Sequence, residues 1–124
     1  MSAGDRPILL VEDNPMDVDL TLRAFKRRRV TNTIHVARDG EEALAWMARW
    51  QAGEPWPAVI LLDLKLPKVD GLEVLRQLKQ HPALRVIPVV VLTTSGESAD
   101  VQTAYQLGVN SYIVKPVEFE KFMD

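Results

Sequence analysis

Residues Val59–Gly71 have the sequence VILLDLKLPKVDG, and this stretch decides which fold the rest of the chain predicts. The apolar run Ala58–Leu62 has the length of a strand and predicts one that is buried on both faces of a sheet. Asp63 follows this run directly, at the end of the strand where open α/β sheets bind their ligands. We therefore expect the Asp63 carboxylate at the rim of the sheet and open to solvent. The alternative is a loop aspartate that only solvates a strand end.

The rest of the chain repeats this alternation of strand and helix. Asp70 before Gly71, with Glu73 three residues later, predicts a capping box at the start of a helix that ends near Gln80. Four more apolar runs predict strands, over Ile8–Val11, Thr33–Ala37, Pro88–Leu92 and Ser111–Val114. Helices are predicted from Pro15 to about Arg29 after the N-cap Asn14, from Asp39-Gly40 to the loop Gln51–Pro57, from Ser98 to Leu107, and from Glu118 to Asp124. The pattern predicts one α/β domain, residues 1–124, with a parallel sheet and helices on both faces. The last helix is short, so we expect it to be truncated.

The composition excludes several classes of function. No cysteine is present, which excludes disulfides, thiolate zinc sites and cysteine nucleophiles. The formal net charge of −2 gives no general attraction to nucleic acid or to anionic membranes. No apolar run approaches the roughly 20 residues that a membrane span needs. We expect a cytoplasmic domain that binds neither nucleic acid nor a membrane directly.

Polar side chains stand at the ends of four of the five predicted strands. The first strand is followed by Glu12 and Asp13, the third by Asp63, the fourth by Thr93 and the fifth by Lys115. Because the carboxyl ends of parallel strands share one edge of a sheet, we expect these side chains to converge. Three carboxylates in one place repel each other unless a cation lies among them, and a site made only of oxygen ligands suits Mg²⁺.

This set of groups suits the transfer of a phosphoryl group to Asp63. A carboxylate can attack phosphorus and become an acyl phosphate. Mg²⁺ and Lys115 would offset the charge on the transferring oxygens, and Thr93 would donate a hydroxyl hydrogen bond. The sequence contains no Walker-type glycine loop, so we expect a donor that already carries a reactive phosphoryl group rather than ATP.

The ordered set of motifs resembles that of the receiver domain of two-component response regulators. The matching residues are Glu12-Asp13, Asp63, Leu66-Pro67, Asp70-Gly71, Thr93, Tyr112 and Lys115-Pro116, in order along essentially the whole chain. The resemblance implies a flavodoxin-like (βα)5 fold, doubly wound, with five parallel strands in the order 2-1-3-4-5. It also implies a protein that catalyses only its own phosphorylation and the hydrolysis of its aspartyl phosphate, and is otherwise not an enzyme.

The resemblance further implies a role for each acidic residue. Asp63 would accept the phosphoryl group from a phosphohistidine of a sensor kinase. Asp13, Asp63 and the backbone carbonyl of Lys65 would bind Mg²⁺ directly, while Glu12 would act through water.

The same resemblance implies a conformational switch beside the acids. Lys115 would contact the phosphoryl group, Thr93 would swing toward it, and Tyr112 would follow from an exposed to a buried position. The change would leave by protein contact, and a face that includes Phe119, Phe122 and Met123 of the last helix could join two copies in a homodimer. The loop Gln51–Pro57 resembles that of a subgroup of single-domain regulators which serve phytochrome-like sensor kinases. We interpret Trp46, Trp50 and Trp56 as packing groups rather than as a contact surface.

Three other functions remain open. A receiver-like interaction module could bind partners without being phosphorylated, although such proteins usually lose one of the acids. A hydrolase with an aspartate nucleophile would need an acid/base carboxylate two residues after Asp63, where Lys65 stands. A flavin carrier on this fold would need hydroxyls and amides in its first loop, where Glu12 and Asp13 would repel a phosphate.

Overall fold

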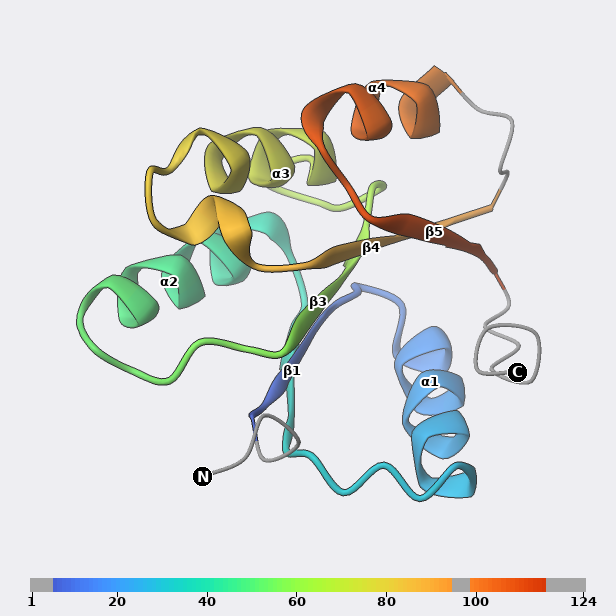
Figure 1. Cartoon of the computed structure of the whole chain (residues 1–124). Helices are drawn as coiled ribbons and strands as arrows, with labels where there is room; N and C mark the ends of the chain where they lie inside the picture. The colour runs from blue at the N-terminus through green and yellow to red at the C-terminus, as the bar shows by residue number, and fades with distance from the viewer. Residues whose placement is uncertain (1–5, 95–98, 116–124) are drawn as a thin grey trace.

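The computed structural model describes residues 6–94 and 99–115. The predicted helix start at Ser98 and the predicted last helix, with Phe119, Phe122 and Met123, lie outside these residues. In the described part of the chain, strands and helices alternate as predicted (Figure 1). No helix in these ranges has both the length and the apolar character that a membrane span requires.

The elements form one parallel sheet covered by helices. The strands are β1 (Ile8–Val11), β2 (Ile34–Ala37), β3 (Val59–Asp63), β4 (Val89–Thr93) and β5 (Ser111–Val114). The helices are α1 (Pro15–Arg27), α2 (Gly40–Gln51), α3 (Gly71–Gln80) and α4 (Ala99–Leu107), with a short 3₁₀ helix η2 (Leu84–Val86) that the sequence did not predict. All paired strands run parallel in the order β2-β1-β3-β4-β5, which confirms the order 2-1-3-4-5.

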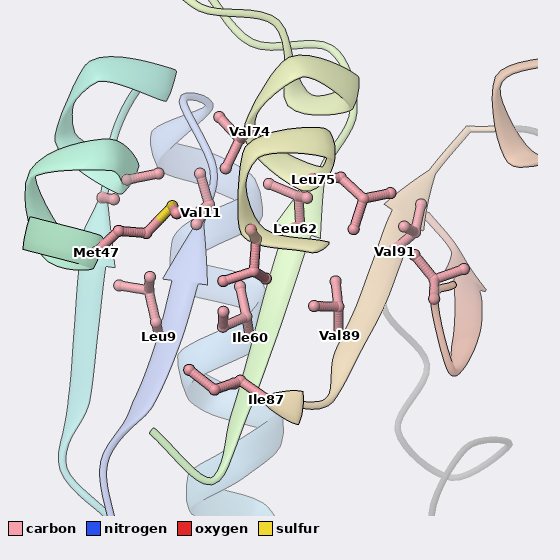
Figure 2. Close-up of a cluster of buried hydrophobic side chains, with 14 of the residues drawn as sticks. Leu9, Val11, Met47, Ile60, Leu62, Val74, Leu75, Ile87, Val89 and Val91 are labelled. Atoms are coloured by element: carbon pink, nitrogen blue, oxygen red, sulfur yellow. The ribbon is translucent and has the colours of Figure 1, made fainter. Parts of the chain in front are cut away.

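The sheet is buried on both faces because alternate side chains of each strand point to opposite sides. Leu9 and Val11 of β1 pack toward α2 and α3, in the cluster that Figure 2 shows. Ile8 and Leu10 pack in a second cluster with Val18 of α1. Figure 1 shows α1 on one side of the sheet and α2 and α3 on the other. Burying one such side chain stabilises the fold by about 1.5–3 kcal/mol, so the two clusters make the strands a rigid support for the groups at their ends.

Helix α1 begins at the predicted cap. Asn14 Oδ1 accepts hydrogen bonds from the backbone N–H groups of Met16 (2.8 Å) and Asp17 (3.3 Å), and Pro15 occupies the first helical position. The helix ends at Arg27, two residues earlier than predicted, because Arg29 adopts a left-handed conformation with φ of 59°.

The other two predicted caps have different outcomes. Asp39 caps α2 through a hydrogen bond that its Oδ1 accepts from Glu42 N (2.9 Å), as predicted. The capping box at Asp70 was wrong: within the described residues the Asp70 side chain makes no cap hydrogen bond. The Glu73 carboxylate instead accepts hydrogen bonds from Arg76 and Gln77 on its own helix, so it is not free to reach back to Asp70.

The loop between β3 and α3 is packed too closely for side chains at two glycines. A Cβ at Gly71 would overlap the Asp63 carbonyl oxygen and lie 2.5 Å from Leu64 Cα. A Cβ at Gly40, the first residue of α2, would overlap the carbonyl oxygen of Val69. The loop therefore lies backbone to backbone against β3 and α2, and this packing fixes the position of the strand end at Asp63.

Candidate functional site

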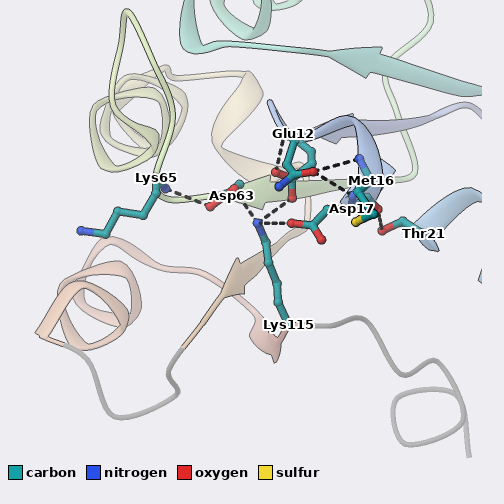
Figure 3. Close-up of polar contacts among 8 residues, drawn as sticks. Glu12, Met16, Asp17, Thr21, Asp63, Lys65 and Lys115 are labelled. Carbon is teal, nitrogen blue, oxygen red and sulfur yellow. Dashed lines mark hydrogen bonds and ion pairs between the residues drawn. The ribbon is translucent and has the colours of Figure 1, made fainter. Parts of the chain in front are cut away.

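The side chains predicted from the strand ends meet at one edge of the sheet. Asp63 and Thr93 are the last residues of β3 and β4, one residue later in the strand than predicted, and Glu12 and Lys115 directly follow β1 and β5. Figure 3 shows Glu12, Asp63 and Lys115 brought together from distant parts of the chain. Glu12, Asp63 and Lys115 border an open cavity of about 470 Å³. Its full lining is Glu12, Asp13, Asn14, Asp17, Asp63, Lys65, Thr94 and Lys115. The predicted convergence of Glu12, Asp13, Asp63 and Lys115 is confirmed.

The ammonium group of Lys115 lies at the centre of the site (Figure 3). Its Nζ donates hydrogen bonds to Asp63 Oδ2 (2.7 Å) and Asp17 Oδ2 (3.2 Å), and it lies 2.8 Å from Glu12 Oε1. Burial alone would lower the pKa of Lys115, but the contacts with Asp63 and Glu12 outweigh burial and raise this pKa above its ordinary value. Lys115 is therefore a fixed positive charge at every physiological pH.

Asp63 is more enclosed than the sequence suggested. We expected a carboxylate open to solvent, but the residue is only 4% exposed. Its Oδ2 is covered by Lys115, and its Oδ1 accepts a hydrogen bond from the backbone N–H of Lys65 (2.9 Å). The expectation was wrong because it considered only the local strand end, whereas the cover comes from a lysine after β5.

Glu12 is the most deeply buried acid of the site, at 1% exposure. Its Oε2 accepts a hydrogen bond from Asn14 N (3.2 Å). Among the described residues none donates a well-formed hydrogen bond to Oε1, so its 2.8 Å contact with Lys115 is an ion pair without hydrogen-bond geometry. Burial raises the pKa of Glu12 to about 7, while Lys115 opposes this rise and the neighbouring Asp63 adds to it.

The acids fit a divalent cation. One carboxylate oxygen from each of Glu12, Asp13 and Asp63 lies within 4.8 Å of the other two. Among the described residues, the buried Glu12 Oε1 has the ion pair with Lys115 but no directed hydrogen bond, so it has acceptor capacity left for a cation or for a water bound to a cation. Asp13 is exposed and lines the cavity, so the set remains open to solvent on that side. An all-oxygen set with an open side suits Mg²⁺, which keeps several of its waters.

Lys65 contributes its backbone to the site while its side chain leaves it (Figure 3). Its Nζ lies 3.0 Å from Asp100 Oδ2 on α4, and the hydrogen bond to Asp100 raises the pKa of Lys65. This exposed ion pair joins the β3–α3 loop to α4 across the edge of the cavity. Such an exposed pair contributes little to stability, because solvent screens it.

Thr93 ends β4, and Tyr112 lies on the neighbouring strand β5. Thr93 is buried and lines a second cavity of about 130 Å³ together with Asp63 and Lys115, so it belongs to the same site. Tyr112 is 36% exposed and does not line either cavity. Its ring meets that of Tyr105 on α4 edge to face, with 6.1 Å between ring centroids. The structure thus places Tyr112 in an exposed position outside the acid cluster.

Sequence reasoning missed Asp17. This residue lies in the first turn of α1, four positions after Asp13, and one helical turn brings its carboxylate back to the cavity. The sequence did contain a signal, namely a carboxylate at helical spacing from the acids of the first loop. The role of Asp17 nevertheless depends on its contact with Lys115, which lies 98 residues further along the chain.

Comparison with known proteins identifies the family. A family model described as "Response regulator receiver domain" matches residues 8–124. The probable methanogenesis regulatory protein FilR2 of Methanothrix harundinacea is 51% identical over 114 residues, which are 91% of this chain and 74% of that protein. Response regulator Rcp1 of Synechocystis sp. is 47% identical over 112 residues, covering 87% of this chain and 75% of that protein.

Solved structures agree with this result. The bacteriophytochrome response regulator AtBRR matches with a TM-score of 0.85 and 54% identity, over 95% of this chain and 87% of that chain. The Mn²⁺-bound form of Rcp1 matches with a TM-score of 0.81 and 42% identity, over 94% of this chain and 85% of that chain. These matches support the interpretation that the chain falls in the phytochrome-associated subgroup. The chain belongs to the response regulator receiver domain family.

Proposed function

We propose that this receiver domain is a phosphoacceptor switch in which Asp63 takes a phosphoryl group from a phosphohistidine in a Mg²⁺-dependent reaction. The observation that carries the proposal is the Asp63 carboxylate itself. It stands at a rigid strand end, one oxygen is oriented by the Lys65 N–H, and the other faces an ammonium group at 2.7 Å. This arrangement presents a carboxylate to an open cavity and provides positive charge where phosphoryl oxygens would arrive.

The transfer balances without a further reactant. An Asp63 oxygen attacks phosphorus and forms the P–O bond of an acyl phosphate, while the P–N bond to the histidine imidazole breaks. The imidazole nitrogen keeps the electron pair of that bond and is left neutral or takes a proton from solvent. Lys115 would exchange its contact with Asp63 Oδ2 for one with a phosphoryl oxygen, because both oxygens occupy the same side of the cavity. Thr93 would donate a hydroxyl hydrogen bond from the second cavity.

We assign the metal to the carboxylates of Asp13 and Asp63 and the backbone carbonyl of Lys65, with Glu12 acting through water. Mg²⁺ held there would supply positive charge to the phosphoryl oxygens. Glu12 Oε1, which accepts no directed hydrogen bond from the described residues, supports this assignment, as does the Mn²⁺ bound by the relative Rcp1.

The partners follow from the relatives and from the exposed surface. Identity of 54% to a bacteriophytochrome response regulator supports a sensor histidine kinase of the phytochrome type as the phosphoryl donor. The signal would pass to a partner protein that contacts α4 and β5, where Tyr105, Tyr112 and Val114 are exposed. Movement of Thr93 toward the phosphoryl group would let Tyr112 turn inward. The altered face, together with the last helix that the sequence predicts outside the described residues, would pair two copies of the chain.

The test is labelling by a small acyl phosphate, such as acetyl phosphate, in the presence and absence of Mg²⁺. Wild-type protein should gain one phosphoryl group by mass spectrometry only when Mg²⁺ is present, and Asp63→Asn should gain none. Asp70→Asn is the matched control, because it removes an exposed carboxylate from the same loop and should label normally. Labelling of Asp63→Asn at the wild-type level would refute the assignment. A wild type that never labels would favour the unphosphorylated interaction module instead.

A further inference from the structure

Among the described residues, Asp17 and Asp63 are the two acceptors to which the Lys115 ammonium donates directed hydrogen bonds. The proposed function does not yet use the contact with Asp17. Nζ donates to Asp17 Oδ2 at 3.2 Å and to Asp63 Oδ2 at 2.7 Å, whereas the 2.8 Å contact with Glu12 Oε1 lacks hydrogen-bond geometry. An ammonium group has three N–H donors, so its rotation is fixed by the acceptors that lie in line with them. Asp17 therefore helps to fix the direction in which the Lys115 ammonium donates its hydrogen bond to Asp63.

The backbone at Asp17 is held firmly enough for this task. Its N–H donates to Asn14 Oδ1 (3.3 Å), and its carbonyl oxygen accepts a hydrogen bond from the Thr21 hydroxyl (2.8 Å). The next residue, Val18, is buried in the cluster between α1 and the sheet. Three independent contacts thus fix the first turn of α1, and the Asp17 carboxylate, 25% exposed, projects from that fixed turn into the cavity.

The fixed position of the Asp17 carboxylate matters because it helps to hold the Lys115 ammonium in place. Lys115 reaches the cavity from the end of β5, and its long side chain would lose much of its rotamer freedom on being fixed. Contacts on the α1 side and on the β3 side hold the ammonium between them (Figure 3). When Asp63 becomes an acyl phosphate, its Oδ2 ceases to be a full negative charge. The α1-side contact remains and keeps the ammonium facing the phosphoryl group.

We infer that Asp17 is a positioning residue for phosphoryl transfer, which acts by orienting the Lys115 ammonium toward Asp63. This inference rests on the proposed function. It concerns one further residue of the same site, and it predicts a change in rate rather than in the identity of the acceptor.

The experiment compares Asp17→Ala, Asp17→Asn and Asp19→Ala with the wild type. Alanine is the best helix former, so Asp17→Ala should keep α1 intact. Asp19 is the matched control because it lies on the same helix, carries the same charge and pairs with Arg23 at 2.9 Å on the exposed surface. Asp17→Asn removes the charge but retains an oxygen that can accept the hydrogen bond from Lys115.

The first readout needs neither metal nor phosphate. In metal-free protein, the side-chain ammonium of an ordered, hydrogen-bonded lysine gives a ¹H–¹⁵N signal in nuclear magnetic resonance, and Lys115→Arg identifies the signal by its loss. The signal should be sharp in the wild type and in Asp19→Ala, and should be broadened or lost in Asp17→Ala. A Lys115 signal that is unchanged in Asp17→Ala would overturn the inference.

The second readout is the rate of labelling as a function of acetyl phosphate concentration. Asp17→Ala should lower the rate at saturating donor by about threefold to tenfold, less than the loss of a directly reacting group because Asp17 acts only through Lys115, without raising the half-saturating concentration. Asp17→Asn should recover part of the rate, and Asp19→Ala should match the wild type. Equal losses in Asp17→Ala and Asp19→Ala would indicate a general charge effect and overturn the inference. If the wild type itself does not label, the proposed function fails, while the ammonium signal still decides whether Asp17 orients Lys115.

Discussion

Removal of the Lys115 ammonium should make the stability of this domain depend strongly on Mg²⁺. Lys115→Met keeps the length of the side chain but leaves Glu12 and Asp63, at 1% and 4% exposure, without their cation. Removing one partner of a buried ion pair costs about 3–5 kcal/mol. Protonation of Glu12, whose pKa is already raised to about 7, would relieve part of this cost, so we expect a loss of about 3 kcal/mol in metal-free buffer.

Mg²⁺ should return much of that loss. The metal and the ammonium share Glu12 and Asp63, so deletion of Lys115 removes a like charge and should raise Mg²⁺ affinity by about tenfold, or about 1.4 kcal/mol. At a free Mg²⁺ concentration of about 100 times the dissociation constant, a bound ligand stabilises a protein by about 2.7 kcal/mol. Lys115→Met should therefore gain more from Mg²⁺ than the wild type does.

The measurement is urea unfolding followed by circular dichroism, in EDTA and in excess Mg²⁺. Lys79→Met is the matched control, since Lys79 is another partly buried lysine whose Nζ donates to the carbonyl oxygens of Arg85 (3.0 Å) and Ile87 (3.2 Å), away from the acids. Its loss of stability should be the same in both buffers. Equal stabilisation of Lys115→Met and wild type by Mg²⁺, or no loss of stability in EDTA, would refute the view that ammonium and metal share these carboxylates.

Three further changes test the frame around the site. Gly71→Ala should destabilise the domain by about 1–3 kcal/mol and weaken Mg²⁺ binding, because a Cβ there would overlap the Asp63 carbonyl oxygen. Urea unfolding measures the stability and calorimetry the binding of Mg²⁺. Mg²⁺ binding as tight as that of the wild type would contradict this prediction. His81→Ala should cost about 1 kcal/mol, measured by thermal unfolding, because His81 Nδ1 accepts hydrogen bonds from two backbone N–H groups at the start of η2. His81→Asn should retain most of that stability, and equal losses in both variants would exclude the capping role. Asp39→Ala should cost about 1 kcal/mol by the same measurement through loss of the α2 cap on Glu42 N, with Glu41→Ala as the neutral comparison.

The sheet and the convergence of the site could be predicted because both depend on patterns that are local in the sequence. Each buried strand is an apolar run of four or five residues, and parallel pairing brings the carboxyl ends of all strands to one edge. The positions of the acids at the carboxyl ends of β1 and β3 follow from that geometry alone, without knowledge of any distance.

Other features could not be predicted, and two of them depend on contacts between distant residues, which no local pattern encodes. Asp63 is enclosed because Lys115 reaches it from the end of β5, and Asp17 joins the site for the same reason. The capping box at Asp70 does not form because the Glu73 carboxylate accepts hydrogen bonds from two residues of its own helix. Sequence spacing alone does not predict which of the possible partners Glu73 contacts. The strand ends could be placed only to within one residue, since the hydrogen bonds of the ladder rather than the apolar run determine where β3 stops.

The positions of the three tryptophans decide which optical signals this protein can give. Trp50 is buried near the C-terminal end of α2, Trp56 donates from its indole nitrogen to the Trp50 carbonyl oxygen (3.4 Å), and Trp46 stacks on His35 with 4.4 Å between ring centroids. Because α2 runs antiparallel to the strands, Trp50 and Trp56 lie toward the edge of the sheet opposite the acids. Intrinsic fluorescence will therefore report global unfolding but stay nearly silent when a cation or a phosphoryl group arrives. A fluorophore for following those events in real time has to be introduced beside the cavity, on the exposed part of the first turn of α1.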